Sequence, residues 1–212
     1  NPATDFTAIA PLANTSFVVV ANAKTDLKSI QDVVREGKEG KIAFGSSGSG
    51  TPQHIIGEMF NTAAGIKIQH IPYKGSGPLL TDIVGGQVQL AFENPLVMLP
   101  QIKSGALRAL AVTGSKRLPT LPDVPTLDEL GFKGFDAQPW YGFLGPKGLP
   151  DDITKRMNEA LQKALASPDV KSKLDSLGVQ AMHMSPQQYH DFIQKDIVTW
   201  GAAVKASGAH VD

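Results

Sequence analysis

Short apolar runs alternate with helix-like stretches over the first half of the chain. The stretches between the runs place apolar residues three and four positions apart, as in a helix with one buried face. Strands and helices therefore alternate with short connections, which predicts an α/β fold with a mostly parallel sheet. The apolar runs have the length of strands and lie at 17–22, 41–44, 67–71, 87–92 and 107–112.

Hydroxyl residues and prolines stand where these helices are expected to begin, and glycines stand where most of them end. Thr51 followed by Pro52 suits an N-cap and a first helical residue, and Gly65 suits a C-cap. Asp32 lies three residues after Ser29, which is close to a capping box. The expected helices are 30 to about 37–40, 52–64, 78–86 and 95–103.

The second half of the chain has a different composition. Proline and glycine accumulate over 114–150, and we interpret this stretch as a crossing between two lobes, with a short helix at 126–130. Residues 1–16 show no regular pattern and are expected to be an irregular lead-in. The remaining pattern predicts a strand, two helices, a strand and a final helix, at 140–144, 151–165, 168–177, 179–184 and 186–206.

Loops follow three of the predicted strands, at 45–51, 72–77 and 93–95. Parallel α/β sheets bind ligands in the loops beyond the carboxyl ends of their strands. Because the three loops belong to one compact unit, we expect them to converge on one rim.

The first of these loops is the strongest candidate for chemistry. A strand, a glycine-rich loop and a helix N-terminus would leave unpaired backbone N–H groups and the positive end of a helix dipole facing one point. The loop lacks the Lys-Ser/Thr of a phosphate-binding P-loop, the spacing of a dinucleotide fingerprint and a Gly-x-Ser-x-Gly elbow. It therefore predicts a neutral anion nest, although a tight turn without ligand fits the same residues. The nest comprises Ser46, Ser47, Gly48, Ser49, Gly50 and Thr51.

Five residues near the loops are further candidates, each with an ordinary structural alternative. His54, in the first turn of the following helix, would donate to a bound carboxylate or simply pack. Tyr73 and Lys74 would supply an aromatic wall and a cation, or form a solvated turn. Glu93 and Asn94 would accept a ligand ammonium or hydroxyl group, or cap the next helix.

Composition excludes several other functions. Lys+Arg and Asp+Glu both number 20, so the chain lacks the excess of basic residues that is typical of nucleic-acid-binding proteins. There is no cysteine, and no pair of the five histidines has the spacing of a metal site, so no cofactor or metal is expected. The loop serines lack an evident general base, which favours binding over catalysis. A Ser/His hydrolase or transferase and a ligand-free scaffold or sensory domain remain as alternatives.

Six motifs follow one another along the chain: Gly45–Thr51 with His54, Ile71–Gly75, Asp82–Gly86, Gly105–Thr113, Leu121–Thr126, and Trp140 followed by Gly142. This ordered series closely resembles the Bug-type extracytoplasmic solute receptors of tripartite tricarboxylate transporters. The resemblance runs from about Phe6 to Asp212.

The resemblance implies a non-enzymatic receptor with the two-lobed, type II periplasmic-binding-protein (Venus flytrap) architecture. Such receptors capture a small carboxylate between the lobes and deliver it to membrane permease subunits. Residues 14–134 would form one complete lobe, and 1–13 with 135–212 would form part of the other. The implied location is the periplasm. The chain begins at Asn1 without a signal peptide, so either a leader has been removed or the chain is a fragment.

One feature departs from the family. Its members carry a preceding segment with a Pro-Gly-Gly loop that forms the opposite side of the carboxylate site, and no Pro-Gly-Gly occurs here. The first lobe is therefore expected to be incomplete. Missing strands would leave sheet edges and apolar surface open, which predicts dimerisation or strand exchange through that lobe.

Overall fold

The fold was analysed in a computed structural model, which describes residue 1 and residues 3–207. The chain forms two compact units: one comprises 1–15 and 139–202, and the other comprises 16–138 and 203–207. The sequence predicted the divisions at 13/14 and 134/135 and the chain after 202 within the smaller part. Each unit has its own sheet.

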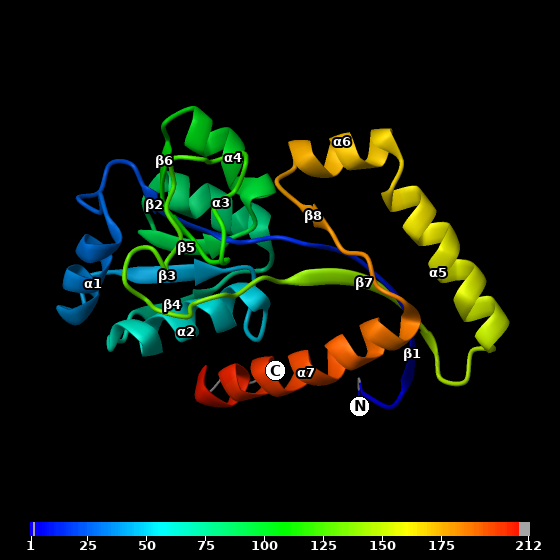
Figure 1. Ribbon diagram of the computed structural model, residues 1–212. Helices are drawn as coiled ribbons and strands as arrows, with labels where there is room; N and C mark the ends of the chain where they lie inside the picture. The colour runs from blue at the N-terminus through cyan, green and yellow to red at the C-terminus, as the bar shows by residue number, and fades with distance from the viewer. Residues whose placement is uncertain (2, 208–212) are drawn as a thin grey trace. The chain divides into compact units, whose positions relative to one another are not determined.

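The larger unit is built on a five-stranded sheet with the order β4-β3-β5-β2-β6 (Figure 1). β3 pairs in parallel with β4 and β5, whereas β2 is antiparallel to both β5 and β6. Four strands thus share one direction and β2 opposes them, so the expected mostly parallel sheet has an antiparallel strand within it. The strands are β2 (Val18–Asn22), β3 (Ala43–Ser46), β4 (Gln69–Pro72), β5 (Leu90–Glu93) and β6 (Leu107–Val112).

Four helices connect these strands, and their caps largely follow the sequence. They are α1 (Ile30–Lys38), α2 (Pro52–Ala64), α3 (Ser76–Gly85) and α4 (Pro95–Lys103). The Ser29 hydroxyl accepts the Asp32 amide at 3.1 Å, as a capping box requires. Gly65 ends α2 with a left-handed φ of 61°, a conformation that glycine adopts without steric cost.

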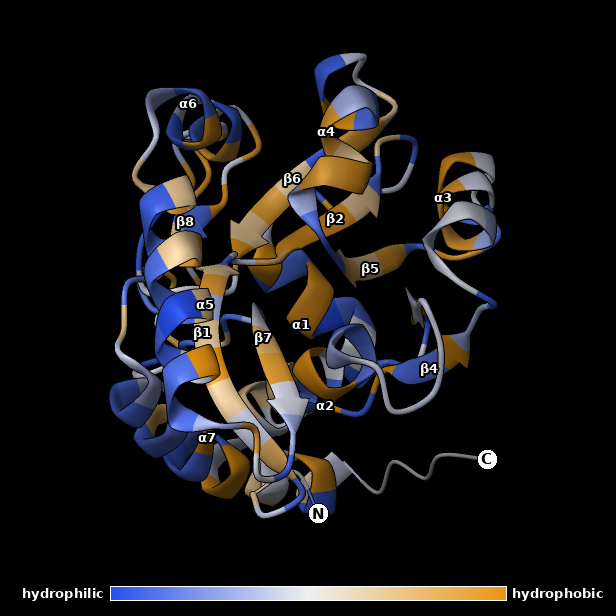
Figure 2. Cartoon of the chain, turned by 90° about the vertical axis from the view of Figure 1, so that its right-hand side faces the viewer, coloured by the Kyte–Doolittle hydropathy of each residue, from blue (hydrophilic) through white to orange (hydrophobic). Residues whose placement is uncertain are grey.

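Both faces of the five-stranded sheet are buried, because helices cover each of them. Val18, Val20 and Ala91 pack with residues of α3 and α4, including Leu79 and Met98. On the α2 side, the aromatic rings form a cluster in which Phe92 contacts Phe44 and Phe60 with centroids 5.6 Å apart. Figure 2 shows β2, β5 and β6 in hydrophobic colours, as expected for strands that are covered on both faces.

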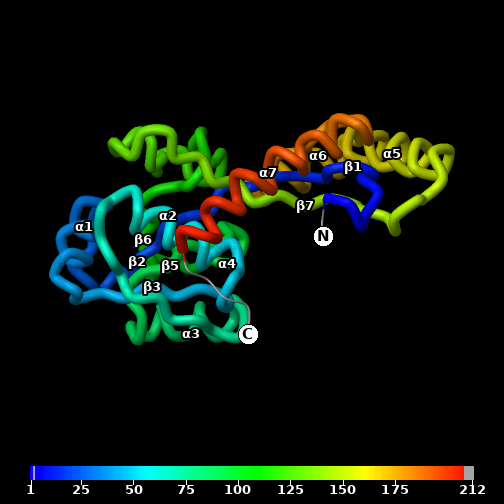
Figure 3. Tube along the Cα trace, turned by 90° about the horizontal axis from the view of Figure 1, so that it is seen from below, coloured from blue at the N-terminus to red at the C-terminus, as the bar shows by residue number. Residues whose placement is uncertain are grey.

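The smaller unit has a three-stranded sheet with the order β7-β1-β8, in which β1 pairs antiparallel with both neighbours. β1 and β7 run side by side along most of their length (Figure 3). Asn158 of α5 donates to the Ile9 carbonyl oxygen at 2.8 Å and anchors that helix to β1. The elements are β1 (Phe6–Asn14), β7 (Trp140–Pro146), α5 (Asp151–Leu165), α6 (Pro168–Ser176), β8 (Gln180–Ala181) and α7 (Pro186–Ser207), of which α7 belongs to this unit up to residue 202.

The predicted irregular lead-in is wrong, because residues 6–14 form β1. Its sequence is rich in alanine and contains Pro11, which are poor signs of a strand. The strand forms because β7, more than 120 residues away, supplies its hydrogen-bonding partner. The register shifts on either side of Ala10 and Pro11 accommodate the proline in the ladder.

Other expectations were wrong in their boundaries. α3 begins at Ser76 rather than Pro78, and the expected helix at 126–130 is a bridge from Thr126 to Val112 followed by turns at 127–130. Thr126 and Glu129 still exchange capping-box hydrogen bonds, so the cap is present without the helix. The strand expected at 179–184 is limited to 180–181. Among the described residues, no helix is long and apolar enough to cross a membrane.

Close packing of α2 on β3 yields a test of the core. A methyl group on Gly57 would lie 2.3 Å from the Phe44 ring, which is fixed among other aromatic rings. Gly57→Ala should therefore lower the free energy of unfolding by about 1–3 kcal/mol, despite the better helix propensity of alanine. Urea unfolding of Gly85→Ala, whose added methyl meets nothing within 4 Å, provides the matched control. Equal stabilities of the two variants would contradict this account of the α2 interface.

Candidate ligand site at the loop edge of the five-stranded sheet

The loops after β3, β4 and β5 meet at one edge of the sheet, which we call the loop edge. The strands are parallel and adjacent, so their carboxyl ends lie together. The Tyr73 amide donates to the Ser46 carbonyl oxygen at 2.9 Å, and the Gly75 amide donates to the Ser47 carbonyl oxygen at 3.0 Å. These bonds join the first two loops, and the expected convergence on one rim is confirmed.

Glu93, the last residue of β5, joins the third loop to the other two. Its side chain is fully buried. Oε1 accepts from Gln53 Nε2 at 2.8 Å and from the Asn94 amide at 2.7 Å, and Oε2 accepts from the Ser76 hydroxyl at 2.9 Å. Gln53 lies in the first turn of α2 and Ser76 begins α3, so one carboxylate holds two helix N-termini together.

The glycine-rich loop differs from the predicted nest, because three of its amides are already paired. The Gly48 amide donates to the Ser46 hydroxyl at 3.2 Å, the Gly50 amide to His54 Nδ1 at 3.1 Å, and the Thr51 amide to the Gly48 carbonyl oxygen at 3.4 Å. Gly48 and Gly50 have φ values of 150° and 75°, which turn the loop back on itself. The expectation that these amides face outward is therefore wrong.

The unpaired donors lie instead at the beginnings of two helices. Thr51 is the N-cap of α2, but its hydroxyl donates to the Gly48 carbonyl oxygen at 2.7 Å and does not cap the helix. Gly75, the N-cap of α3, has no side chain with which to cap. Asn94 does cap α4, accepting the Leu96 amide at 3.0 Å. The loop edge thus combines uncapped α2 and α3 termini, which carry partial positive charge.

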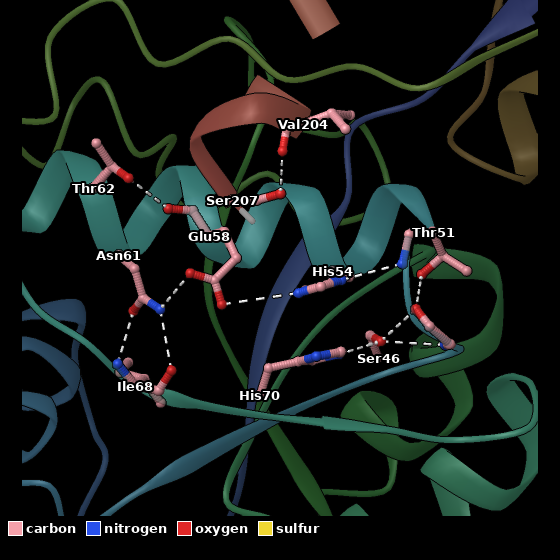
Figure 4. Close-up of polar contacts among 12 residues, drawn as sticks. Ser46, Thr51, His54, Glu58, Asn61, Thr62, Ile68, His70, Val204 and Ser207 are labelled. Atoms are coloured by element: carbon pink, nitrogen blue, oxygen red, sulfur yellow. Dashed lines mark hydrogen bonds and ion pairs between the residues drawn. The ribbon is translucent and has the colours of Figure 1, made fainter. Parts of the chain in front are cut away.

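Two histidines lie beside the loop and contact it (Figure 4). The imidazoles of His54 on α2 and His70 on β4 stack with centroids 3.7 Å apart and planes 7° from parallel. His54 Nδ1 accepts the Gly50 amide, so its proton lies on Nε2, 4.0 Å from Glu58 Oε1. His70 Nε2 lies 2.7 Å from the Ser46 hydroxyl. His54 is buried and packs beneath the loop.

Both imidazoles are neutral at neutral pH. Burial, together with the smaller effect of the neighbouring His54, lowers the pKa of His70 to about 4. Burial also lowers the pKa of His54, while the Glu58 carboxylate opposes that shift. A proton on His54 Nδ1 would remove the acceptor of the Gly50 amide, so the observed loop geometry requires the neutral ring.

The other predicted residues lie around the rim. Tyr73 is half-buried against Gly45, and burial raises the pKa of its phenol, as does a hydrogen bond with Asp82. Lys74 and Ser49 are exposed, and Ser47 is half-buried. The sequence did not indicate Gln53, Ser76 or His70. Only position in the first turn of a helix could have drawn attention to Gln53 and Ser76.

The serine-histidine contact corrects another expectation. The loop serines were predicted to lack a general base, yet His70 lies within hydrogen-bonding distance of Ser46. Ser46 is nevertheless fully buried, and its hydroxyl donates to the Gly48 carbonyl oxygen at 2.9 Å. A buried hydroxyl engaged in this way fixes the loop and does not face a substrate. Among the described residues, no group of three or more potential metal-binding side chains is present.

Comparisons with known proteins agree with one another. The profile of the tripartite tricarboxylate transporter family receptor matches residues 1–209. Protein BugT of Bordetella pertussis (strain Tohama I) is 35% identical over 207 residues, or 97% of this chain. The structure of R. palustris Rpa4515 with adipate has a TM-score of 0.90 at 30% identity, and periplasmic binding protein BugD has 0.88 at 31%.

The chain is shorter than these relatives. It spans 64% of the length of BugT. Both solved structures match 99% of this chain, which in turn covers 71% of the Rpa4515 chain and 72% of the BugD chain. These proteins therefore share the fold of the whole chain and have additional polypeptide.

The histidine pair predicts an acid-sensitive stability. The folded pKa of His70, about 4, is below its ordinary value of 6.5, so the unfolded chain takes up the proton first as the pH falls. Stability from His70 should be complete above about pH 6.5 and decrease from there towards pH 4. Thermal unfolding of His70→Gln should show a smaller decrease in Tm over this range than the unsubstituted protein.

His183→Gln is the control, because His183 is exposed and its imidazole contacts Gln162 at 2.7 Å rather than another histidine. It should keep the full pH dependence. Identical pH profiles for His70→Gln and His183→Gln would contradict a buried neutral histidine pair.

Proposed function

Because the chain belongs to the tripartite tricarboxylate transporter receptor family, we propose that it is a solute-binding receptor for a small carboxylate. It captures the acid at the loop edge and delivers it to the membrane permease subunits of a tripartite transporter. It acts by binding and release, without a catalytic step or cofactor. Rpa4515, its structural relative, was solved with adipate, which supports a carboxylic acid as the ligand class.

The uncapped N-termini of α2 and α3 carry this proposal. They meet at one edge of the sheet, where Tyr73 and Gly75 bond to the strand and loop before α2. The unpaired backbone N–H groups of these helix ends can donate to an anion there. These N–H donors are neutral, so the site can bind a carboxylate without placing a cation in the protein interior. In this assignment the side chains that surround the ligand at the loop edge are those of Ser47, Ser49, Thr51, Tyr73 and Lys74.

The remaining predicted residues act from behind the rim. Ser46, Gly48, Gly50 and His54 form the folded loop that positions the start of α2. Asn94 caps α4 and donates its amide to Glu93. These residues order the site, and among them only the backbone amide of His54, in the first turn of α2, is assigned to the ligand.

We further propose that the two units correspond to the two lobes of a Venus-flytrap receptor. The unit of 16–138 has a five-stranded sheet with helices on both faces and would be the complete lobe. The unit of 1–15 and 139–202 has three strands and would be the incomplete one. BugD is described as a periplasmic binding protein, and we assign this chain to the same compartment.

A ligand-free scaffold is the second candidate, and the paired loop amides favour it. Gly48, Gly50 and Thr51 donate within the loop and its helix, as a self-contained turn would. This candidate leaves the uncapped ends of α2 and α3 unexplained. Measurement of ligand binding separates the two.

Gly77 offers a direct test of the α3 terminus. It is exposed in the first turn, and a side chain there meets nothing within 4 Å. Gly77→Asp places a carboxylate where the ligand carboxylate should bind. It should lower affinity for acids at least about tenfold in calorimetric titration, while the helix dipole keeps the fold stable. Gly77→Asn is the isosteric neutral control and should bind nearly as the unsubstituted chain does.

Two results would oppose the proposal. If the unsubstituted chain binds no acid from a panel of mono-, di- and tricarboxylates, aromatic acids and amino acids, the scaffold candidate is favoured. If Gly77→Asp and Gly77→Asn bind equally well, the ligand does not meet the start of α3.

We also propose that the smaller unit dimerises through β7. This edge strand pairs on one side only, with β1, among the described residues. Exposed apolar side chains cluster on the two strands: Phe6 is 50%, Tyr141 51% and Phe143 44% exposed. Unpaired edges with apolar side chains favour association.

Sedimentation velocity tests this association. Phe143→Lys should shift the protein towards monomer, because a charge on the edge opposes strand pairing. Val198→Lys alters an even more exposed apolar residue, at 73%, on α7 and should leave the association unchanged. A monomer at all concentrations, or an equal effect of both variants, would refute dimerisation through β7.

A further inference from the structure

Glu93 is an unusual residue in this fold because it is a buried carboxylate without a cation. Among the described residues, it is the one Asp, Glu, Lys or Arg that is buried. None of the ion pairs within 4.0 Å in the described chain involves it. Burying an unpaired charge is costly, so something else must stabilise it.

The helix N-termini provide that stabilisation. Three groups donate to the carboxylate, from Gln53 of α2, Ser76 of α3 and the Asn94 amide just before α4. Each helix end carries roughly half a positive charge, so the uncapped ends of α2 and α3 together carry roughly one. The single negative charge of Glu93 offsets this amount.

Resting on the proposed receptor function, we propose that Glu93 determines how much negative charge the loop edge accepts. With its charge offset, the edge presents hydrogen-bond donors but little surplus positive potential. It therefore accepts one carboxylate and discriminates against an acid whose second carboxylate lies close to the first. A distant second carboxylate is not affected, because repulsion falls with distance and is screened by solvent.

Lys74 does not alter this balance substantially. It is the one cation of the rim segments 45–51, 72–77 and 93–95, and it is exposed. Solvent screening weakens the effect of an exposed charge, whereas Glu93 acts from a buried position. The selectivity thus depends on Glu93 together with the helix ends.

A purely structural role for Glu93 is the alternative, since it also braces α2 against α3. Glu93→Gln separates the two roles. The glutamine oxygen can accept from Gln53 and the Asn94 amide, and its NH₂ group can donate to the Ser76 hydroxyl, which accepts as well as it donates. The three contacts are kept and the charge is removed.

The experiment compares acids with matched carbon chains by calorimetric titration. Propionate has one carboxylate, and malonate, of the same chain length, has two that are separated by one carbon. Hexanoate has one carboxylate, and adipate, again of the same chain length, has two that are far apart. Glu93→Gln should increase affinity for malonate about tenfold relative to propionate, as expected for removal of one unit-charge repulsion. The adipate-to-hexanoate ratio should change by less than about twofold.

Gln53→Lys provides a second variant if Glu93→Gln does not fold. A lysine at this first-turn position reaches the carboxylate of Glu93 and neutralises it in place. The malonate-to-propionate ratio should rise in the same direction. Ser49→Lys is the control, because it adds the same charge at an exposed loop position, and it should change this ratio by less than Gln53→Lys does.

The outcomes distinguish the two levels of the proposal. If the unsubstituted protein binds none of the four acids or any other carboxylate, the receptor function itself fails. If it binds acids but Glu93→Gln and Gln53→Lys change malonate and propionate affinities by the same factor, the residue is a structural brace and the charge-selection proposal is overturned. A selective gain for malonate supports it.

Discussion

The carboxylate of Glu93 is the contact on which the arrangement of the loop edge depends. It receives donors from the beginnings of α2, α3 and α4, and it lies at the end of a strand in the middle of the sheet. The parallel directions of β3, β4 and β5 bring these helix starts together, and the carboxylate fixes their spacing. In the proposed receptor, backbone donors are thus aligned before any acid arrives, which reduces the entropy lost on binding.

Local chemistry made much of this fold predictable. Pro52 and Pro95 begin their helices, Gly65 and Gly86 end theirs, and the loops after β3, β4 and β5 converge as expected. β1 was not predictable, because it depends on β7, a partner remote in sequence, and its alanines give no local strand signal. Parallel pairing likewise sets the bounds of β3, β4 and β5, which begin two or three residues, and end one or two residues, later than their apolar runs.

The candidate site was predictable in location but not in its contacts. Glycine spacing identified the loop, yet the loop amides donate to the Ser46 hydroxyl, to His54 Nδ1 and to the Gly48 carbonyl oxygen. No pattern in the sequence links His54 to His70, sixteen residues apart on a helix and a strand, although their rings stack. Glycine richness here reflects a tightly folded loop, and the donors available to a ligand belong to the helices beside it.

Amide resonances of the unsubstituted protein, followed by ¹H–¹⁵N NMR during titration with a bound acid, test the central claim most directly. The account predicts the largest shifts at the first-turn amides of α2 and α3, Gln53, His54 and Gly77. The amides of Gly48 and Gly50, already engaged in the loop, should shift less. Shifts confined to residues outside these two helix starts, with Gln53 and Gly77 unmoved, would contradict carboxylate capture at the loop edge.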